Sequence, residues 1–468
     1  MTKSKIVATL GPASSSTEMI TSLVKAGADL FRLNMSHGDR EAHRALIRRI
    51  RETAPGIGIL GDLCGPKIRV GGLAGGKVEL VEGAKVILRT GEEPGDASSF
   101  HVSYPGLGKG VKRGATILLD DGMMELKALS AKPGEVVCKV VKGGTLKENK
   151  GVNFPGMPLA LPSLTDKDEE DLKMLLSEGV DYVALSFVRE AGDVLALKNS
   201  MSRAGHNAPV IAKVERPEAI RNIKEIVRAA DGIMVARGDL GVEMAPELVP
   251  SLQKRIIKLC NEQRKPVITA TQMLESMVRN PRPTRAEASD VAGAVFDGTD
   301  ALMLSGETAD GAYPEASVEM MTKIAHETEK HLSGARYERE HVSSELEAIA
   351  HSACDTADAL GAKAIICFTC SGSTALLMSK YRPNTAIIAA TPDERTFRVM
   401  QLYYGVVPVM INVQPDTDGM VREVERAVLS KGLVKIGDKT VVTLGVPVGK
   451  GCSTNLMLLH EIGGGFGN

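Results

Sequence analysis

The segment Gly232–Thr271 reads GIMVARGDLGVEMAPELVPSLQKRIIKLCNEQRKPVITAT and contains two short apolar runs separated by a longer helical pattern. Gly232–Ala236 and Val267–Thr271 have the length and composition of buried strands. Glu247–Gln263 between them has the apolar spacing of a helix. A strand, a helix and a second strand in this order are typical of a parallel βαβ unit.

The same alternation extends through most of the chain up to residue 335. Apolar runs of strand length recur, and helical patterns such as Thr165–Glu178 lie between them. The predicted strands are Lys5–Leu10, Leu30–Ser36, Gly58–Leu63, Tyr182–Phe187, Val210–Glu215, Gly232–Ala236, Val267–Thr271 and Ala301–Ser305. Eight such units predict an α/β fold with a closed (β/α)8 TIM barrel.

Two regions depart from this alternation. Residues 67–160 are rich in Gly turns and short alternating runs, which predict an antiparallel β-barrel lid domain inserted into the barrel. The insertion divides the barrel domain into residues 1–66 and 161–335. A polar stretch at 336–340 predicts a linker, and residues 343–468 predict a C-terminal open-sheet α/β domain. The strands predicted in these two regions are Lys77–Leu80, Lys85–Arg89, Thr116–Leu119, Val136–Val140, Ala364–Thr369, Ala386–Thr391, Val406–Ile411, Thr440–Leu444 and Leu456–His460.

The composition excludes several classes of protein. The 468 residues carry 57 Lys and Arg against 58 Asp and Glu, which leaves no basic surplus for nucleic acid or an anionic membrane. No apolar run reaches the roughly 20 residues that span a bilayer, and no signal-peptide core follows the first residues. Seven scattered cysteines favour reduced thiols over a disulfide framework. We therefore expect a cytoplasmic protein without nucleic-acid or membrane partners.

Polar side chains gather where the predicted barrel strands end. Arg32, Asn34 and Ser36 share one face of the second strand, because alternate residues of a strand point the same way. Lys213 and Glu215 share a face near the end of the fifth strand in the same manner. The residues at the ends of the third, sixth, seventh and eighth strands are Asp62, Asp239, Thr271, Ser305 and Glu307. Buried polar groups are costly without a partner, so this end of the barrel is the predicted active site.

The types of these residues indicate the chemistry. Glu215 and Asp239 offer two hard oxygen ligands for Mg²⁺, whose octahedron water and substrate oxygens would complete. Lys213 beside them supplies a positive charge for a transferring phosphoryl group. Arg32 and Arg69 can each bind phosphate oxygens through two parallel hydrogen bonds. The residues alone therefore predict magnesium-assisted chemistry on a small phosphorylated anion.

Long motifs in the chain are also those of a known family. They are Gly11–Ser14 (GPAS), Arg32–Gly38 (RLNMSHG), Gly65–Arg69 (GPKIR), Met234–Gly241 (MVARGDLG), Ala270–Met277 (ATQMLESM), Pro281–Glu287 (PRPTRAE) and Met303–Thr308 (MLSGET). With these motifs in order along nearly its whole length, the chain resembles the pyruvate kinases of the bacterial type. The resemblance implies a barrel domain A, an inserted lid domain B and a C-terminal regulatory domain C.

The resemblance also implies a reaction and roles for single residues. The reaction is phosphoryl transfer from phosphoenolpyruvate to ADP, which yields pyruvate and ATP in glycolysis. Glu215 and Asp239 are then ligands of the catalytic Mg²⁺, a second Mg²⁺ arrives with ADP, and Lys213 stabilises the transition state. Thr271, with Ser305 or a water, protonates the enolate. The implied substrate contacts are Arg32, Lys213, Gly238, Asp239 and Thr271, and the implied nucleotide contacts are Arg32, His37, Arg69 and Lys150.

One motif departs from many members of the family. Those enzymes hold potassium with groups that match Asn34, Ser36, Asp62 and the carbonyl of Leu63, and they carry Glu where this chain has Lys67. The lysine ammonium can supply the positive charge that potassium brings, and it would repel a monovalent cation at close range. We therefore expect a potassium-independent subgroup.

The C-terminal domain contains a candidate effector site. Residues 369–374 read TCSGST, follow a predicted strand and open a predicted helix, a setting whose hydroxyls and amides suit a phosphate. The phosphate-binding residues would be Thr369, Ser371, Gly372, Ser373 and Thr374. Family members activated by fructose 1,6-bisphosphate carry Lys and Arg where this chain has Cys370 and Ser373. We expect a sugar monophosphate or AMP as activator, with an ordinary helix-capping turn as the alternative. By the same resemblance we expect a homotetramer.

Two other functions remain open at this stage. Another magnesium-dependent keto-acid enzyme on a barrel would share Glu215 and Asp239, but it would need neither the lid nor Lys213 and Arg69. A non-catalytic metabolite sensor would be expected to lose Lys213 or a magnesium ligand, and the chain keeps both. Formation of ATP and pyruvate from phosphoenolpyruvate, ADP and Mg²⁺ separates these functions.

Overall fold

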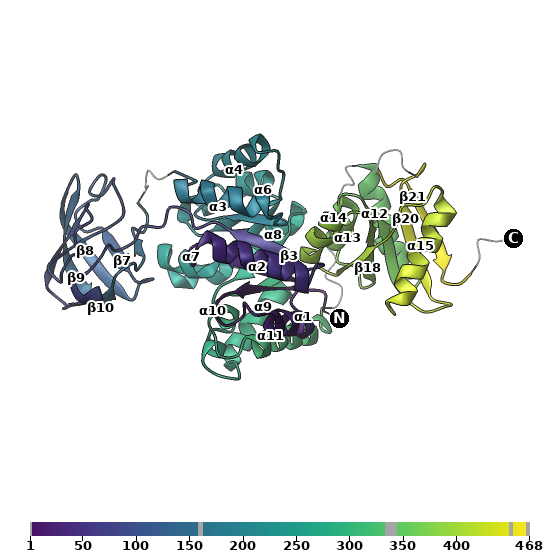
Figure 1. Ribbon diagram of the computed structural model, residues 1–468, viewed down its shortest axis with the longest axis horizontal. Helices are drawn as coiled ribbons and strands as arrows, with labels where there is room; N and C mark the ends of the chain where they lie inside the picture. Colours follow the sequence, from purple (N-terminus) through teal and green to yellow (C-terminus); the bar gives the residue numbers. More distant parts are fainter. Residues whose placement is uncertain (1, 158–161, 333–343, 449–452, 465–468) are drawn as a thin grey trace.

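The computed structural model describes residues 2–157, 162–332, 344–448 and 453–464. Figure 1 shows an elongated molecule in which the inserted lid, the barrel and the C-terminal domain follow one another along the long axis. The predicted linker at 336–340 and the predicted boundary residues 160, 161, 335 and 343 lie outside the described residues. The domain boundaries therefore stay predictions.

Eight parallel strands close the barrel in the order β1-β16-β15-β14-β13-β12-β3-β2. Their bounds are β1 Lys5–Leu10, β2 Leu30–Asn34, β3 Gly58–Asp62, β12 Tyr182–Leu185, β13 Val210–Val214, β14 Gly232–Ala236, β15 Val267–Ala270 and β16 Ala301–Leu304. The predicted closed barrel is confirmed. Most predicted strands run one or two residues too far, because the polar residues at their ends leave the sheet to form loops.

Helices surround the barrel and bury one apolar face against it. They are α1 Thr17–Ala26, α2 Arg40–Thr53, α3 Asp166–Ser177, α4 Ala191–Arg203, α5 Pro217–Arg221, α6 Ile223–Ala229, α7 Arg237–Glu243, η2 Pro246–Leu248, α8 Val249–Glu262, η3 Glu275–Val278, α9 Arg285–Asp297, α10 Gly306–Ala309 and α11 Pro314–Glu329. Helix α2 illustrates the pattern, since it buries Leu46, Ile47 and Ile50 while its arginines face outward. The core between these helices and the strands is the largest apolar cluster of the protein.

The barrel interior is apolar toward the beginnings of the strands. Leu60, Tyr182, Ile211 and Met234 fill it, and they form one continuous core with buried residues of the C-terminal domain. The Tyr182 hydroxyl donates a hydrogen bond to the Val399 carbonyl at 2.6 Å. The C-terminal domain therefore covers the base of the barrel, and the lid lies toward the opposite end, where the strands finish (Figure 1).

The lid strands form a six-stranded sheet in the order β11-β7-β8-β9-β5-β6 and a two-stranded sheet of β10 and β4. The bounds are η1 Ala74–Gly76, β4 Lys77–Leu80, β5 Lys85–Arg89, β6 Ser99–His101, β7 Thr116–Leu119, β8 Met124–Lys132, β9 Glu135–Lys142, β10 Gly144–Lys147 and β11 Val152–Asn153. The pairs are antiparallel except for β5 with β6, which is parallel. The predicted β lid thus consists of two sheets around one apolar core rather than a single closed barrel.

The C-terminal domain is an open sheet in the order β19-β18-β17-β20-β21, as predicted. Its strands are parallel except for β21, which pairs antiparallel with β20 at one edge. The bounds are α12 Glu345–Ala359, β17 Ala364–Phe368, α13 Ser373–Lys380, β18 Ala386–Thr391, α14 Glu394–Val399, η4 Met400–Leu402, β19 Val406–Met410, α15 Thr417–Ser430, β20 Lys439–Leu444 and β21 Leu456–Glu461.

One cysteine is not in the reduced state that the sequence predicts. Cys64, Cys138, Cys260, Cys354 and Cys367 carry free thiols. Cys370 is disulfide-bonded, so the prediction of reduced thiols is wrong for this residue. An odd and sparse set of cysteines does not exclude one pair that the fold brings together. Within the described ranges, none of the helices has both the length and the apolar composition needed to cross a bilayer.

Candidate active site

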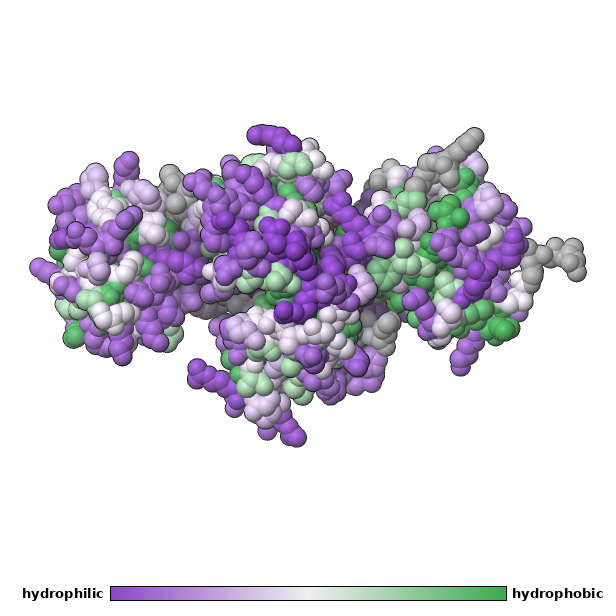
Figure 2. All heavy atoms as spheres, in the orientation of Figure 1, coloured by the Kyte–Doolittle hydropathy of each residue, from purple (hydrophilic) through white to green (hydrophobic). Residues whose placement is uncertain are grey.

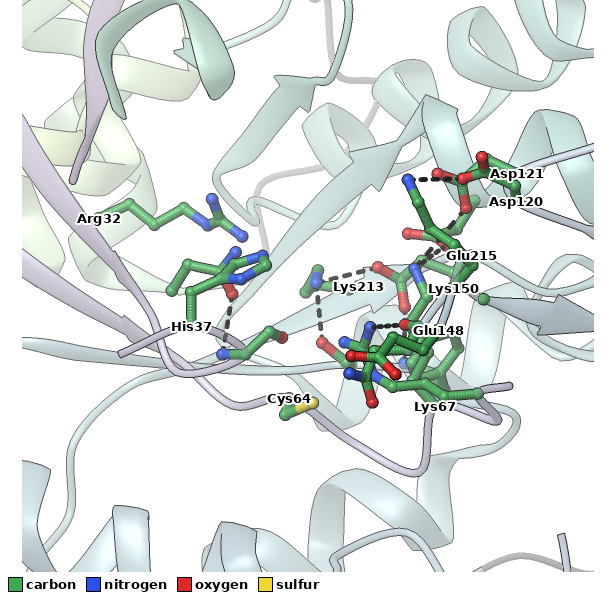
Figure 3. Close-up of a pocket in the computed structure, with 18 residues that line it drawn as sticks. Arg32, His37, Cys64, Lys67, Asp120, Asp121, Glu148, Lys150, Lys213 and Glu215 are labelled. Carbon is green, nitrogen blue, oxygen red and sulfur yellow. Dashed lines mark hydrogen bonds and ion pairs between the residues drawn. The ribbon is translucent and has the colours of Figure 1, made fainter. Parts of the chain in front are cut away.

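A cavity of about 640 Å³ opens between the carboxyl ends of the barrel strands and the lid. Of the residues predicted from the sequence, it is lined by Arg32, Asn34, Ser36, His37, Lys67, Arg69, Lys150, Lys213, Glu215 and Asp239. Figure 3 shows Lys213 and Glu215 between Arg32 on one side and Asp120 and Asp121 of the lid on the other. Most of the predicted site residues therefore line one continuous space.

Lys213 lies at the centre of this cavity. Its Nζ is 2.9 Å from Glu215 Oε1, 3.3 Å from Asp62 Oδ1 and 2.7 Å from Ser186 Oγ. Burial disfavours the charged ammonium, but the carboxylates of Asp62 and Glu215 outweigh it and hold the pKa of Lys213 above its ordinary value. The lysine therefore stays a cation at physiological pH.

Glu215 is fully buried beside this ammonium. Its Oε2 accepts a hydrogen bond from the Phe187 backbone N–H at 2.8 Å. Burial raises the pKa of Glu215, and the negative charge of Asp239 raises it further against the opposing effect of Lys213. A divalent cation shared with Asp239 would relieve this repulsion, so the two carboxylates suit Mg²⁺. No group of three or more acidic, His or Cys side chains suited to a metal occurs in the described part of the chain.

Arg32 and Asp62 form a buried ion pair at the other wall of the cavity. Arg32 Nε donates to Asp62 Oδ2 at 2.6 Å, and Arg32 Nη1 donates to Thr9 Oγ1 at 3.1 Å. Despite burial, Lys213 and Arg32 hold the pKa of Asp62 below its ordinary value. Asp62 is therefore an anion that orients both cations toward the cavity.

The groups matching the potassium ligands already have protein partners. The Leu63 carbonyl accepts a hydrogen bond from Ser186 Oγ at 2.7 Å, and Asp62 binds Arg32 and Lys213. Asn34 Oδ1 accepts from the Ser36 backbone N–H at 3.2 Å.

The ammonium of Lys67 lies on the side of the cavity formed by Asp239. Its ionic contacts among the residues that the structure describes are Asp239 Oδ1 at 3.3 Å and Asp121 Oδ1 at 3.9 Å. The sequence predicted this charge next to Asp62, whereas the structure directs the side chain toward Asp239 and the lid. A long lysine at the hinge reaches the carboxylates on either side of the cleft, and motif comparison does not specify its rotamer.

The lid contributes the remaining predicted cations. Lys150 Nζ is 2.8 Å from Asp120 Oδ1, and Arg69 Nη1 donates to the Asn149 carbonyl at 3.0 Å. Burial and the charge of Arg69 lower the pKa of His37, so its imidazole is neutral at physiological pH. Lys150 and Arg69 line the lid side of the same cavity, whereas His37 lies in the barrel loop after β2.

Gly238, Asp239 and Thr271 line a neighbouring cavity of about 540 Å³. Thr271 has a φ of 76°, a backbone conformation that costs a β-branched residue on the order of 1–3 kcal/mol. Such strain is typical of functional sites, because the surrounding structure must hold it in place. Ser305 follows β16, the strand that pairs with β15, and it lines a third cavity of about 680 Å³ together with Arg32 and His37.

Sequence reasoning missed several residues that line the cavity, among them Ser186 and Phe187. Both follow β12, the strand from which no polar candidate was taken. Ser186 Oγ contacts Lys213 and the Leu63 carbonyl, and Phe187 presents its N–H to Glu215 from a left-handed conformation with a φ of 55°. The serine at this strand end was the available signal. Glu307, in contrast, binds the backbone N–H groups of Ser305 and Leu274 and therefore shapes the loops.

The candidate effector loop lies in the C-terminal domain, away from this cavity. Helix α13 begins after Gly372, which has a φ of 80° and provides no side-chain cap. The Gly372 N–H donates to Thr369 Oγ1 at 2.9 Å, and Ser371 Oγ donates to Ser373 Oγ at 3.1 Å. Thr374 Oγ1 lies 2.9 Å from Thr454 Oγ1.

A buried ammonium among carboxylates at the mouth of a barrel suits the transfer of a phosphoryl group, because it can stabilise negative charge in transit. The fold and the site therefore define a phosphotransferase. A family model described as "Pyruvate kinase, barrel domain" matches residues 1–318, and one described as "Pyruvate kinase, alpha/beta domain" matches residues 347–460. The chain belongs to the pyruvate kinase family.

Individual relatives agree over nearly the whole chain. A pyruvate kinase of Staphylococcus saprophyticus is 47% identical over 475 residues, which cover 99% of this chain and 81% of the relative. A pyruvate kinase of Staphylococcus aureus is 46% identical over 479 residues, covering 100% and 82%. The crystal structure of a pyruvate kinase from Cryptosporidium parvum matches with a TM-score of 0.92 at 37% identity, covering 98% of this chain and 96% of that one.

The resemblance found in the sequence motifs is thus confirmed. The protein is an enzyme that transfers the phosphoryl group of phosphoenolpyruvate to ADP and releases pyruvate and ATP, with the Mg²⁺ dependence of its family. The two alternative functions, a keto-acid enzyme of another kind and a non-catalytic sensor, are not supported.

Proposed function

We propose that Lys213 stabilises the transition state of this transfer and that Glu215 and Asp239 hold the catalytic Mg²⁺. The observation that carries this assignment is the buried contact of 2.9 Å between Lys213 Nζ and Glu215 Oε1. It puts a fixed positive charge next to the metal ligands, where negative charge develops on the moving phosphoryl group. The metal, when bound, supplies further positive charge and orients the phosphate oxygens.

The substrate binds in the same proposal between Arg32, Lys213, Gly238, Asp239 and Thr271. Arg32 has Asp62 behind it, so its guanidinium is oriented before the phosphate arrives. After transfer, the enolate of pyruvate takes a proton at its terminal carbon from Thr271, acting with Ser305 or a water. Thr271 and Ser305 follow the neighbouring strands β15 and β16, and each of them lines a cavity at this end of the barrel.

The nucleotide binds between the barrel and the lid, through Arg32, His37, Arg69 and Lys150, and brings a second Mg²⁺. The neutral imidazole of His37 can donate a hydrogen bond without adding charge. Lys150 and Arg69 belong to the lid and its hinge, so their contacts to ADP would draw the lid toward the barrel. A closed lid excludes water that would otherwise compete with ADP for the phosphoryl group.

The test of this assignment is Lys213→Met with two measurements. We expect turnover to fall by far more than about tenfold, a barrier increase of more than about 1.4 kcal/mol. Binding of Mn²⁺ in place of Mg²⁺, followed by electron paramagnetic resonance, should persist because Glu215 and Asp239 remain. Lys198→Met, which breaks an ion pair with Asp231 on the outside of the barrel, is the matched control. Turnover above a tenth of wild type would remove Lys213 from this role.

We further infer a potassium-independent enzyme with Lys67 in place of the cation. Two observations support this: Asp62 and the Leu63 carbonyl already bind protein donors, and the Lys67 ammonium adds a positive charge to the cavity. The contact of Lys67 with Asp239 indicates that the charge acts from the magnesium side. We also propose, from the composition of the chain, that the enzyme is cytoplasmic.

We also infer that a small phosphorylated molecule activates the enzyme and that the enzyme is a homotetramer. A single phosphate, from a sugar monophosphate or AMP, would bind Thr369, Ser371, Gly372, Ser373 and Thr374, because the uncapped start of α13 leaves backbone N–H groups available.

A homotetramer is supported by exposed apolar side chains on two parts of the molecule. Phe296 at the end of α9 is 55% exposed, and in the C-terminal domain Leu459 on the edge strand β21 is 60% exposed and Ile436 is 78% exposed. Figure 2 shows apolar residues gathered on the C-terminal domain. Light scattering after size exclusion measures the oligomer directly.

A further inference from the structure

Arg237 has no role in the site described so far, although it directly precedes Gly238 and Asp239. Its side chain is only 12% exposed and reaches across to the loop after β15. There Nε donates to the carbonyl oxygens of Ala270 and Thr271 at 3.3 Å each. Nη2 donates to the same Thr271 carbonyl at 2.8 Å. The guanidinium therefore holds the backbone of the strained threonine from two nitrogens.

The other side of the guanidinium is fixed to the outer helices. Nη1 donates to Asp290 Oδ1 on α9 at 2.7 Å and to Gln253 Oε1 on α8 at 3.3 Å. Nη2 lies 2.7 Å from Asp290 Oδ2 and 2.8 Å from the sulfur of Met273. The arginine thus connects the loop of Thr271 to two helices that do not line the main cavity.

These contacts use every donor of the guanidinium. Arginine has five N–H groups in a planar fork, and each of its three nitrogens here has at least two partners. None is left for the carboxylate or phosphate of a substrate. Arg237 can therefore affect the reaction only through the groups that it holds, the closest being the Thr271 carbonyl.

The held segment needs such support. Thr271 and Gln272 have φ values of 76° and 56°, so two consecutive residues with side chains adopt the left-handed conformation. This conformation is uncommon for residues other than glycine and persists only where surrounding contacts impose it. Rotation of the Thr271 peptide to an ordinary conformation would move its carbonyl away from Arg237 and its side chain away from Gly238.

We propose that Arg237 is a positioning residue for the protonation of the enolate and acts through the backbone of Thr271. This inference rests on the proposed role of Thr271. In that step a C–H bond forms at the terminal carbon of the enolate while the O–H bond of the donating hydroxyl or water breaks. The donor oxygen regains a proton from solvent, so the protein is unchanged at the end.

The test compares two rates in the whole enzyme with Mg²⁺. One is ATP formation from phosphoenolpyruvate and ADP, and the other is exchange of the pyruvate methyl protons with deuterium oxide, followed by proton NMR. Arg237→Lys keeps the charge near Asp290 but cannot reach both carbonyls. We expect the ratio of exchange to ATP formation to fall at least about tenfold, with the KM for phosphoenolpyruvate nearly unchanged.

Arg51→Lys is the matched control. Arg51 also binds two backbone carbonyls, of Ile57 and Gly179, and one aspartate, Asp181, but at the base of the barrel. It should leave the ratio of the two rates unchanged. If Arg237→Lys lowers exchange and ATP formation by the same factor, the arginine has a structural role only and the inference is overturned.

A double-mutant cycle separates this inference from the proposed role of Thr271. If Arg237 acts through Thr271, adding Arg237→Lys to Thr271→Ala lowers exchange no further than Thr271→Ala alone. A multiplicative loss would overturn the inference. If Thr271→Ala itself leaves exchange intact, the proposed role of Thr271 fails, and this inference fails with it. If Thr271→Ala abolishes exchange while Arg237→Lys leaves it intact, only the inference fails.

Should Arg237→Lys not fold, Asp290→Asn offers a second route. It keeps the arginine and its backbone contacts but weakens the anchor on α9, at a carboxylate that is partly exposed. We expect a smaller decrease of the same ratio, and an unchanged ratio in a fully folded Asp290→Asn would overturn the inference.

Discussion

A β-carbon placed on Gly238 would lie 2.7 Å from Cγ2 of Thr271, closer than such atoms approach in proteins. Gly238 lies in α7, directly before the proposed magnesium ligand Asp239. Because Gly238 has no side chain, there is room beside α7 for the side chain of Thr271. The left-handed backbone conformation of Thr271 places that side chain against the helix. Thr271 and the helix that carries the proposed magnesium ligand Asp239 are therefore packed closely against each other.

Gly238→Ala should consequently damage catalysis more than folding. The added methyl must push Thr271 out of its strained position, so we expect kcat/KM for phosphoenolpyruvate to fall by about tenfold or more. Steady-state kinetics and thermal unfolding measure the two effects separately.

Gly241→Ala is the control in the same helix. Its β-carbon would meet Val249 Cγ2 at 3.7 Å, an ordinary contact, and alanine favours a helix over glycine by about 0.5–1 kcal/mol. We expect full activity and unchanged or slightly raised stability. Equal activity of the Gly238 and Gly241 variants would mean that Thr271 tolerates displacement.

The sequence predicts much of this site because barrel strands deliver their last residues to one place. Arg32, Lys213 and Glu215 follow from the alternation of side chains along β2 and β13, and the cavity contains all three. The predicted first residues of the barrel strands agree with the structure better than the predicted last residues do. The reason is that the apolar pattern stops where the loops of the site begin.

What the sequence does not specify is contact between loops. Ser186 binds Lys213, and Arg237 binds the Thr271 carbonyl, but neither contact has a pattern of its own in the chain. Likewise, the Lys67 ammonium contacts Asp239 and not Asp62, because of the length and rotamer of its side chain. Such choices depend on three-dimensional distances that periodicity and motifs do not encode.

The unmodified enzyme should need no potassium, whereas Lys67→Glu should create a requirement for it. The substitution changes the local charge by two units and removes the cation from beside Asp239. We expect near-full wild-type activity in tetramethylammonium buffer with saturating Mg²⁺, and activation of the variant by KCl at constant ionic strength. Adding Leu63→Thr should strengthen that activation, because the hydroxyl can help to order a cation.

Lys147→Glu controls for the same change of charge on an exposed lid strand, β10. It should leave the enzyme independent of potassium. A tenfold or greater rise of wild-type activity with KCl would show that Lys67 does not replace the ion.

The effector loop should respond to one phosphate rather than two. A cavity of about 140 Å³ beside Thr369 and Cys370 is lined mainly by apolar residues, including Ile411 and Met420, and none of the described residues that line it carries a charge for a second phosphate. Glucose 6-phosphate or AMP should activate at lower concentration than fructose 1,6-bisphosphate in a steady-state assay. Strong activation by the bisphosphate alone would contradict this.

Ser371→Ala and Ser373→Ala test where such an activator binds. Each removes a hydroxyl near the start of α13 without touching the barrel. We expect the concentration for half-maximal activation to rise several-fold while activity without activator stays the same. Unchanged activation in both variants would exclude this loop as the phosphate site.

Lys380 should make stability depend on pH in the alkaline range. This lysine is fully buried between the C-terminal domain and the barrel base, where it donates to Asp300 and, at 2.9 Å, to Asn261 Oδ1. Burial, together with the nearby charge of Arg382, lowers its pKa to about 8 despite the opposing charge of Asp300. The neighbouring thiol of Cys260 has a pKa raised by burial to about 12, so it stays neutral in this range.

The sign of the effect follows from proton counts in the two states. An unfolded lysine keeps its proton up to a pH of about 10.4, whereas the folded one loses it near 8, so between these values the unfolded state binds more protons. The contribution of Lys380 to the free energy of unfolding therefore rises with pH, by at most about 1.4 kcal/mol per pH unit. Lys380→Met lacks this group but leaves Asp300 paired with Arg382. Thermal unfolding of both proteins is measured from pH 7.5 to 9.5. The Tm of the wild type minus the Tm of the variant should increase as the pH rises. Parallel curves would mean that the buried ammonium keeps its proton throughout, held by Asp300.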